Sequence, residues 1–301
     1  MELILKIKLL TASVAAVLLA GCGSDSDPEV KTYSVQAYDP AVIGMEVSYD
    51  CGGDLKGKAD ELTTNYKGMV GYARISHIDV VSAPSECTFT LKHTDKSVDA
   101  SNGKRITTDY KIPKGLAQAD APVTGSPFTT LVTDTLEEGA IYTPEVAEQV
   151  FADLGLDVNA MGVSVNDLLR NTESVVKQLD ESGDAATKAL ATKLVATANV
   201  VSDVIKANPT ASPKAISVAA KAVTEEVIKK NPNYPKNDSG DVIYVEVSEE
   251  DTKDVVNQVE KEIEAGKPVD DFKPVVPPIP DAKPGKPVDP VDPPSGGSGG
   301  N

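Results

Sequence analysis

The chain has 301 residues, with 46 acidic against 29 basic side chains, no tryptophan and four phenylalanines. The resulting net charge of −17 argues against binding to nucleic acid or to anionic lipid surfaces, because both require basic patches. Few large aromatic rings are present on which sugars could stack, although nine tyrosines partly compensate.

Residues 1–21 have the three parts of a secretory signal peptide. Lys6 and Lys8 supply positive charge, residues 9–20 form an apolar stretch, and the small pair Ala20-Gly21 marks a cleavage point. The apolar stretch is about a dozen residues long, whereas a membrane-spanning helix needs about 20. The sequence therefore predicts a cleaved signal rather than a retained transmembrane anchor.

The signal ends in Leu19-Ala20-Gly21-Cys22, which resembles the lipobox of bacterial lipoproteins. The resemblance implies cleavage before Cys22, a diacylglyceryl group on its sulfur and an acyl chain such as palmitate on its amine. Several acyl chains anchor far more firmly than one, since each buried CH2 contributes ~0.8 kcal/mol. Because Gly23 rather than Asp follows the cysteine, the resemblance implies the outer membrane, on its periplasmic face or at the cell surface. An ordinary signal with a chance cysteine is the alternative.

Residues 22–31 are polar and are expected to form a flexible tether. Two cysteines remain beyond it, Cys51 and Cys87. An even pair in an exported protein usually forms a disulfide, which we expect here. Free thiols, a metal site or a nucleophile are the alternatives, but His77 and His93 provide no zinc spacing around the cysteines.

Residues 32–113 are predicted to form a small β-sandwich linked by that disulfide. The segment Cys87–Leu91 alternates in period two, Gly52-Gly53 marks a turn, and Asn102-Gly103 is typical of a hairpin. The pattern from Tyr38 to Val47 resembles small Ig-like or prealbumin-like modules of bacterial surface lipoproteins, over residues 35–112. In such modules a segment like Pro127–Val132 leads into helices, and no catalytic residues carry over. Residues 114–139 are expected to be a connector.

Residues 140–266 have helical periodicity and predict a bundle. We expect helices after Pro144, from Ser164 to Gly183, over about 185–206, after Pro213 and after Ser248. Their apolar stripes favour antiparallel packing within one chain, with an oligomeric coiled coil as the alternative. Residues 242–247 alternate as one short strand whose partner the sequence does not identify.

Residues 267–301 are rich in proline and glycine, so they are predicted to be a disordered tail. A spacer or docking strip that reaches peptidoglycan or a protein partner is the functional alternative. The predicted fold class is therefore α+β: a disulfide-linked β-sandwich, a helical bundle and a disordered tail.

The sequence contains only weak matches to known catalytic motifs. Residues 296–300 read Gly-Gly-Ser-Gly-Gly, but they lack the strand–turn–helix context of a nucleophile elbow. The Ser174–Lys177 segment fits S-x-x-K but lies within an expected helix, without the companion motifs. No P-loop, HExxH or EF-hand pattern is present. We therefore expect no catalytic residues, no cofactor and no metal site, and interpret the chain as non-enzymatic.

Two functional classes follow. The first is a lipid-anchored envelope module for binding or adhesion, whose β-domain loops and Tyr66, Tyr72 or Tyr110 contact a glycan or protein. The second is a periplasmic structural protein that self-assembles through its helices, around Leu190 and Leu194, and helps organise the envelope or cell shape. Expected partners are the membrane through the lipid anchor, a second copy, an envelope protein or peptidoglycan, and no nucleic acid.

Overall fold

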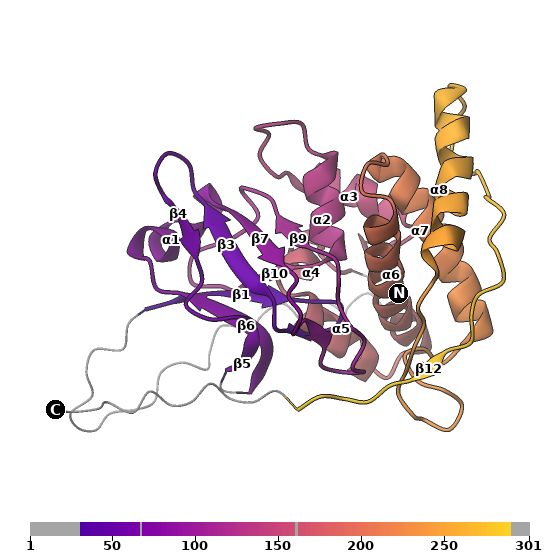
Figure 1. Cartoon of the computed structure of the whole chain (residues 1–301), viewed down its shortest axis with the longest axis horizontal. Helices are drawn as coiled ribbons and strands as arrows, with labels where there is room; N and C mark the ends of the chain where they lie inside the picture. The colour runs from indigo at the N-terminus through magenta and orange to yellow at the C-terminus, as the bar shows by residue number, and fades with distance from the viewer. Residues whose placement is uncertain (1–30, 67, 160–161, 290–301) are drawn as a thin grey trace, which may run out of the picture. The chain divides into compact units, whose positions relative to one another are not determined.

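The computed structural model describes residues 31–66, 68–159 and 162–289. The signal peptide, Cys22 and residues 290–301, which include the Gly-Gly-Ser-Gly-Gly segment, lie outside the described residues. Residues 32–289 form one compact unit in which strands and helices share a continuous apolar core (Figure 1). The mixed α+β class is confirmed. The boundary expected at residue 113 does not divide this unit.

The first sheet has the strand order β10-β1-β6-β5. Strand β1 is central, because it pairs antiparallel with β6 on one side and parallel with β10 on the other. Its side chains are almost all buried, which fits a strand covered on both faces. The strand bounds are β1 (Tyr33–Ala37), β5 (Thr64–Tyr66), β6 (Met69–Ile75) and β10 (Val123–Gly125).

The second sheet is antiparallel throughout, in the order β4-β3-β7-β9. Strand β7 buries Phe89 and Leu91 and exposes the alternating residues Thr88, Thr90 and Lys92, so the period-two prediction is confirmed. A short pair of strands, β2 and β8, and two small helices, α1 and η3, complete this half. The bounds are β2 (Val42–Ile43), β3 (Glu46–Asp50), β4 (Lys56–Lys58), α1 (Ile78–Ser82), η3 (Pro84–Glu86), β7 (Thr88–Lys92), β8 (Val98–Asp99) and β9 (Tyr110–Ile112).

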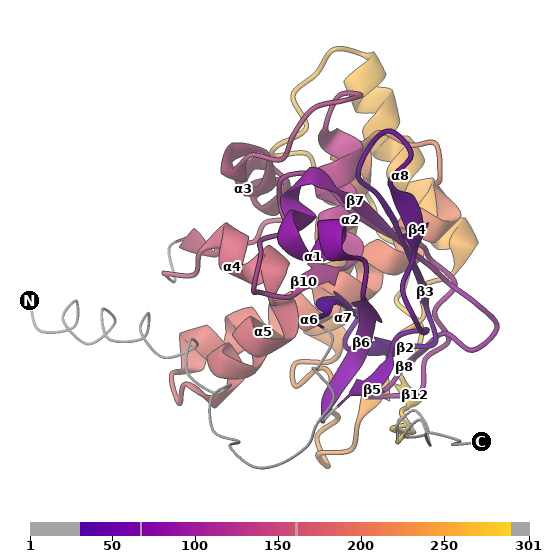
Figure 2. The same ribbon diagram turned by 90° about the vertical axis from the view of Figure 1, so that its left-hand side faces the viewer.

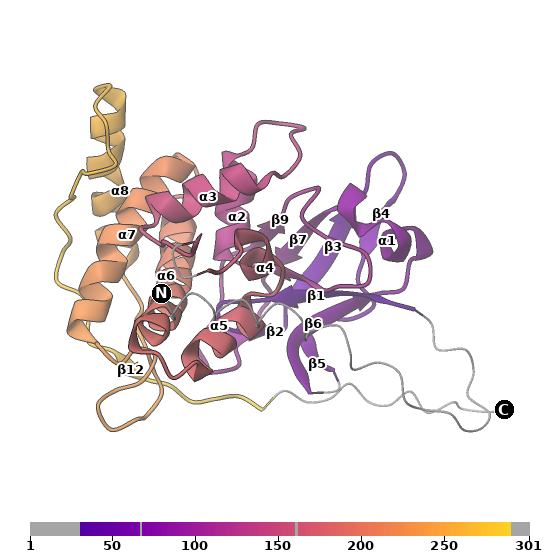
Figure 3. The ribbon, with the colours of Figure 1, turned by 180° about the vertical axis from the view of Figure 1, so that it is seen from behind.

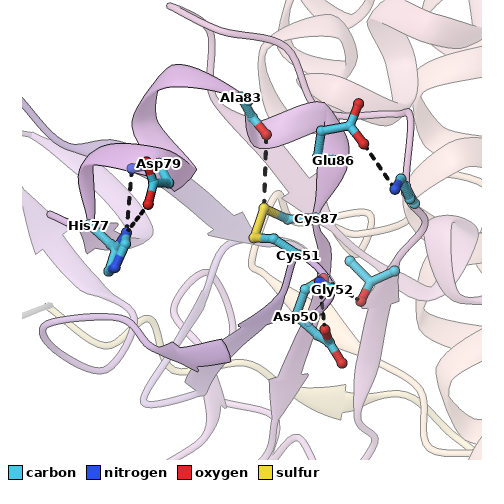
Figure 4. The surroundings of a disulfide bond; sticks show 10 residues. Asp50, Cys51, Gly52, His77, Asp79, Ala83, Glu86 and Cys87 are labelled. Atoms are coloured by element: carbon cyan, nitrogen blue, oxygen red, sulfur yellow. Dashed lines mark hydrogen bonds and ion pairs between the residues drawn. A yellow bond between two sulfur atoms is a disulfide. The ribbon is translucent and has the colours of Figure 1, made fainter. Parts of the chain in front are cut away.

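The disulfide between Cys51 and Cys87 is confirmed (Figure 4). Cys51 directly follows β3 and Cys87 directly precedes β7, and these two strands pair up to Asp50 and Thr88. The bond therefore closes the end of an existing strand pair. Cys87 is fully buried, and its sulfur lies 3.9 Å from the Ala83 carbonyl oxygen at the end of α1.

The predicted connector 114–139 is wrong as a linker, because it contains β10 and the buried helix α2 (Pro127–Thr135). Ser126 and Thr129 form a capping box at its start, and Pro127 occupies the first turn. Phe128 is fully buried, and its ring centroid lies 5.3 Å from that of Phe151. The hydroxyls of Thr130 and Thr133 in α2 donate to backbone carbonyls one turn earlier in the chain. Threonines can therefore be buried in this helix without leaving their hydroxyls unpaired.

The helical half agrees with the periodicity except at one point. The helix expected from Ser164 to Gly183 breaks at Asn171, whose backbone (φ −145°, ψ 54°) is not helical. Four other predicted helices are confirmed. The observed bounds are α3 (Pro144–Asp153), α4 (Val165–Arg170), α5 (Thr172–Glu181), α6 (Ala185–Ala207), α7 (Pro213–Lys230) and α8 (Glu249–Glu264).

Helix α6 lies at the centre of the helical half, packed against α2, α5, α7 and α8. Most of its last four turns are buried, including the small residues Ala196, Ala198 and Ser202. Small side chains allow this close approach of several helices. Figure 2 looks onto the strand side with α7 and α8 behind it, and Figure 3 shows the view of Figure 1 from behind.

Residues 267–289, named here the strap, are ordered against the rest of the unit, so a disordered tail beginning at residue 267 is wrong. The strap contains β12 (Lys283–Pro284), which pairs antiparallel with β11 (Ile243–Tyr244). The strand predicted at 242–247 is therefore shorter than expected, and its partner is the strap. Figures 1 and 3 show the strap passing beside α8 and then below the helices towards the strands.

Candidate functional site

Two of the three tyrosines predicted to contact a ligand are buried. Tyr110 is fully buried and Tyr72 is 7% exposed, so neither can meet a glycan or protein partner. The side chain of Tyr66 lies outside the described residues. Binding through Tyr72 or Tyr110 is therefore wrong.

The apolar helical stripe predicted to support self-assembly is buried within the monomer. Leu194 is fully buried and Leu190 is 8% exposed, both within α6. An aspartate at either position would damage the core of the monomer, so this pair cannot report on assembly. The Ser174–Lys177 segment lies within α5, where the Lys177 ammonium is 4.0 Å from the carboxylate of Glu181, one turn later in the same helix. Its residues line neither of the two grooves described below.

The structure instead reveals a buried polar cluster between the strands and α6. Asp39 lies in the turn after β1 and accepts hydrogen bonds from Tyr110 (2.8 Å) and from the Asn199 side-chain amide (2.8 Å). The same Asn199 accepts from Tyr234 at 2.7 Å, and the Tyr110 hydroxyl lies 3.2 Å from that of Ser202. Residues from four distant parts of the sequence thus meet around one carboxyl group.

A second carboxyl group, Asp99, is buried beside the first. It accepts from the Ser101 backbone and hydroxyl, each at 2.7 Å, and from the Asn102 amide at 2.6 Å. Lys104 follows in the same loop and donates to Asp203 of α6 at 2.8 Å. Thr108 donates to the Ser202 carbonyl at 3.0 Å, so this loop is bonded to α6 at two points.

Burial dominates the electrostatics of the cluster. It raises the pKa of Asp39 to about 7, because the charged form loses its hydration, although Lys104 and Tyr110 oppose the shift. Burial likewise raises the pKa of Asp99 to about 7 against the hydrogen bonds from Ser101. Burial alone would lower the pKa of Lys104, but the charges of Asp203 and Asp39 outweigh it and raise that pKa. The cluster therefore binds and releases protons near neutral pH.

One sequence signal could have revealed this cluster. Asn199, Ser202 and Asp203 interrupt the apolar stripe of α6 at i, i+3 and i+4, and so share one helix face. Polar groups on a buried face need partners. Which partners they meet depends on the packing of Asp39, Lys104 and other remote residues, which no local pattern encodes.

An open groove lies on another face, between α7 and residues 270–276 of the strap. Its volume is about 410 Å³, and Val218, Phe272 and Val276 contribute its apolar lining. Acidic side chains outnumber basic ones around it. A smaller hollow of about 250 Å³ adjoins it, beside α3. The charged residues lining the main groove are Lys221, Glu225, Glu226, Asp270, Asp271 and Lys273.

Among the described residues, no group of three or more His, Cys, Asp or Glu side chains is placed to hold a metal ion. Nor is any helix within those ranges both long and apolar enough to cross a bilayer. No known family, curated protein or solved structure matches this chain.

Proposed function

We propose that the chain is a lipid-anchored, non-enzymatic protein of the bacterial outer membrane that binds a protein partner of the cell envelope. The groove between α7 and the strap carries this proposal, because it is open, partly apolar and acidic at its rim. An acidic rim around apolar residues favours a partner segment that combines Lys or Arg with a hydrophobic side chain. The two sheets are interpreted as a small β-sandwich that supports the helices presenting this groove.

The anchor has a role in this proposal. Lipidation of Cys22 would confine the unit to the membrane surface through the tether of residues 22–31, which joins the unit at Thr32, one residue before β1. A binding protein held in this way needs no chemistry of its own, since localisation of its partner is the effect. A Cys22→Ala chain that folds but fails to retain the partner at the membrane would agree with this reasoning.

The test is site-specific photo-crosslinking in intact cells, with the photoreactive group at the exposed position Lys273. The double variant Glu225→Lys/Asp271→Lys should abolish a specific adduct, because it reverses the charge of the groove rim. The matched control is Glu137→Lys/Glu138→Lys, which changes the net charge equally at exposed positions away from the groove. Equal adducts from both double variants, or none from the parent chain, would contradict the proposal.

A further inference from the structure

The strap binds the α7–α8 surface as an extended peptide would. Three of its side chains, Val269, Pro274 and Ile279, are buried, while most of the others are exposed or half-buried. Proline holds such a segment extended, which lowers the entropy lost on binding. The helical surface therefore already functions as a site for a proline-rich chain.

Polar contacts fix the register of this segment. The Gln258 side chain of α8 accepts from the Val275 backbone N–H (2.8 Å) and donates to the Val275 carbonyl (2.9 Å). Lys230 of α7 donates to the Ile279 carbonyl at 2.6 Å and pairs with Asp281 at 2.8 Å. Backbone contacts and spaced pockets together are the usual basis of extended-peptide recognition.

Charge complementarity extends along the strap. Lys214 of α7 pairs with Asp270 at 2.6 Å, near the start of the strap, and Lys283 pairs with Glu246 near its end. Beyond β12, the Lys286 N–H donates to the Asn102 carbonyl at 2.7 Å. These contacts match the sequence of this strap over its whole length, which favours the same segment of another copy over an unrelated proline-rich peptide.

The connection between α8 and the strap is a tight reversal. Gly266 has a φ of +68°, and its N–H donates to the Ile263 carbonyl at 2.9 Å, while the Lys267 N–H donates to the Glu262 carbonyl at 3.0 Å. This is a helix C-cap that turns the chain back along the helix. If the turn opened, the strap would leave its own helices and could reach those of a neighbour.

We propose that the α7–α8 surface also binds the strap of a second copy, so that neighbouring anchored molecules exchange straps. Exchange replaces each contact with an identical one, so it requires no new complementarity. The strap's ion pairs are largely exposed and contribute little to holding it, which makes opening accessible. Copies confined to one membrane surface meet at a raised effective concentration, which favours the exchanged form. This inference rests on the lipid anchor of the proposed function but not on its groove partner.

The test uses two full-length, lipid-anchored variants expressed in one cell, Gln258→Cys and Val275→Cys. Exchanged straps should give a disulfide between position 258 of one copy and position 275 of the other, read on non-reducing gels and by mass spectrometry. Ile78→Cys replaces Val275→Cys as the collision control, because Ile78 is 65% and Val275 is 76% exposed. We expect the 258–275 product to exceed the 258–78 product about tenfold, since a bound strap raises the effective concentration of its cysteine.

Two further variants make the result decisive. The double variant Gln258→Cys/Val275→Cys in one chain should form the bond within that chain, which shows that the strap is seated. Gly266→Val should increase the bond between copies, because valine strains the left-handed conformation of the closed turn, although a Cβ at this position meets nothing within 4 Å. Equal 258–275 and 258–78 products, an unbonded double variant, or no rise with Gly266→Val would each overturn the proposal.

Discussion

The buried carboxyl groups predict that this protein becomes less stable as the pH rises towards neutrality. An unfolded aspartate releases its proton near pH 4, whereas Asp39 in the folded chain holds it until about pH 7. Between these values the folded state binds one more proton than the unfolded state, so the free energy of unfolding falls with increasing pH. The ordinary acid denaturation of proteins has the opposite sign.

The magnitude follows from the width of that window. Each pH unit within it is worth about 1.4 kcal/mol, so raising the pH from 5 to 8 should remove about 2–3 kcal/mol for Asp39. Asp99 acts in the same direction. Carboxyl groups with a lowered pKa act in the opposite direction, but water screens them, because Asp50 is half-exposed and the others are exposed: Glu145, Asp184, Asp270 and Asp281.

The assay is urea unfolding of the chain from Gly23 at pH 5, 6, 7 and 8, compared with the variant Asp39→Asn. An amide resembles the protonated carboxyl, and the hydroxyls of Tyr110 and Ser202 can turn to accept from it. The decline in stability between pH 5 and pH 8 should therefore be smaller in the variant by about 2–3 kcal/mol, which is the share of Asp39. A parent chain whose stability is flat or rises over this range, or a variant with the full decline, would refute the reasoning.

Three other substitutions have clear expected outcomes. Cys51→Ser/Cys87→Ser should lower the free energy of unfolding by about 3–4 kcal/mol, because the disulfide closes a 36-residue loop. Unfolding of the parent chain in reductant should show the same loss relative to the parent without reductant. Lys104→Met should lower the free energy of unfolding by about 3–5 kcal/mol, because it leaves Asp203 buried without a counter-charge. The double variant Lys104→Met/Asp203→Leu should recover most of that loss. Equal stability of the single and double variants would contradict this expectation. Phe128→Ala should cost about 3–5 kcal/mol through the cavity it leaves at the junction of strands and helices, and a loss below about 1 kcal/mol would show that α2 is not central to the core.

The local sequence pattern was sufficient to predict an element wherever one of its faces is buried and capping or turn residues mark its ends. The alternation of Phe89 and Leu91 gave β7, and Ser212-Pro213 gave the start of α7. Helix α2 was missed because two of its six buried residues, Thr129 and Thr130, are threonines, which read as polar. The break at Asn171 was missed because the apolar spacing continues across it.

The strap and the buried cluster could not be predicted for a different reason. The composition of residues 267–289 is that of a disordered segment, and its order comes from remote partners such as Gln258 and Lys230. The cluster likewise joins residue 39 to residues 99–110, 199–203 and 234, far apart in the sequence. In both cases the decisive contacts are long-range, and single-sequence periodicity reports only neighbours along the chain.

The central place of β1 has a mechanical consequence. The tether would join the lipid anchor to Thr32, so any pull from the membrane enters the unit at the first residue before that strand. Strand β1 is hydrogen-bonded to β6 along one edge and to β10 along the other. A force along its axis therefore acts on both sets of inter-strand hydrogen bonds simultaneously, in shear. Resistance to such a force is set by the rate of unfolding. A body attached through an edge strand would instead peel open one hydrogen bond at a time.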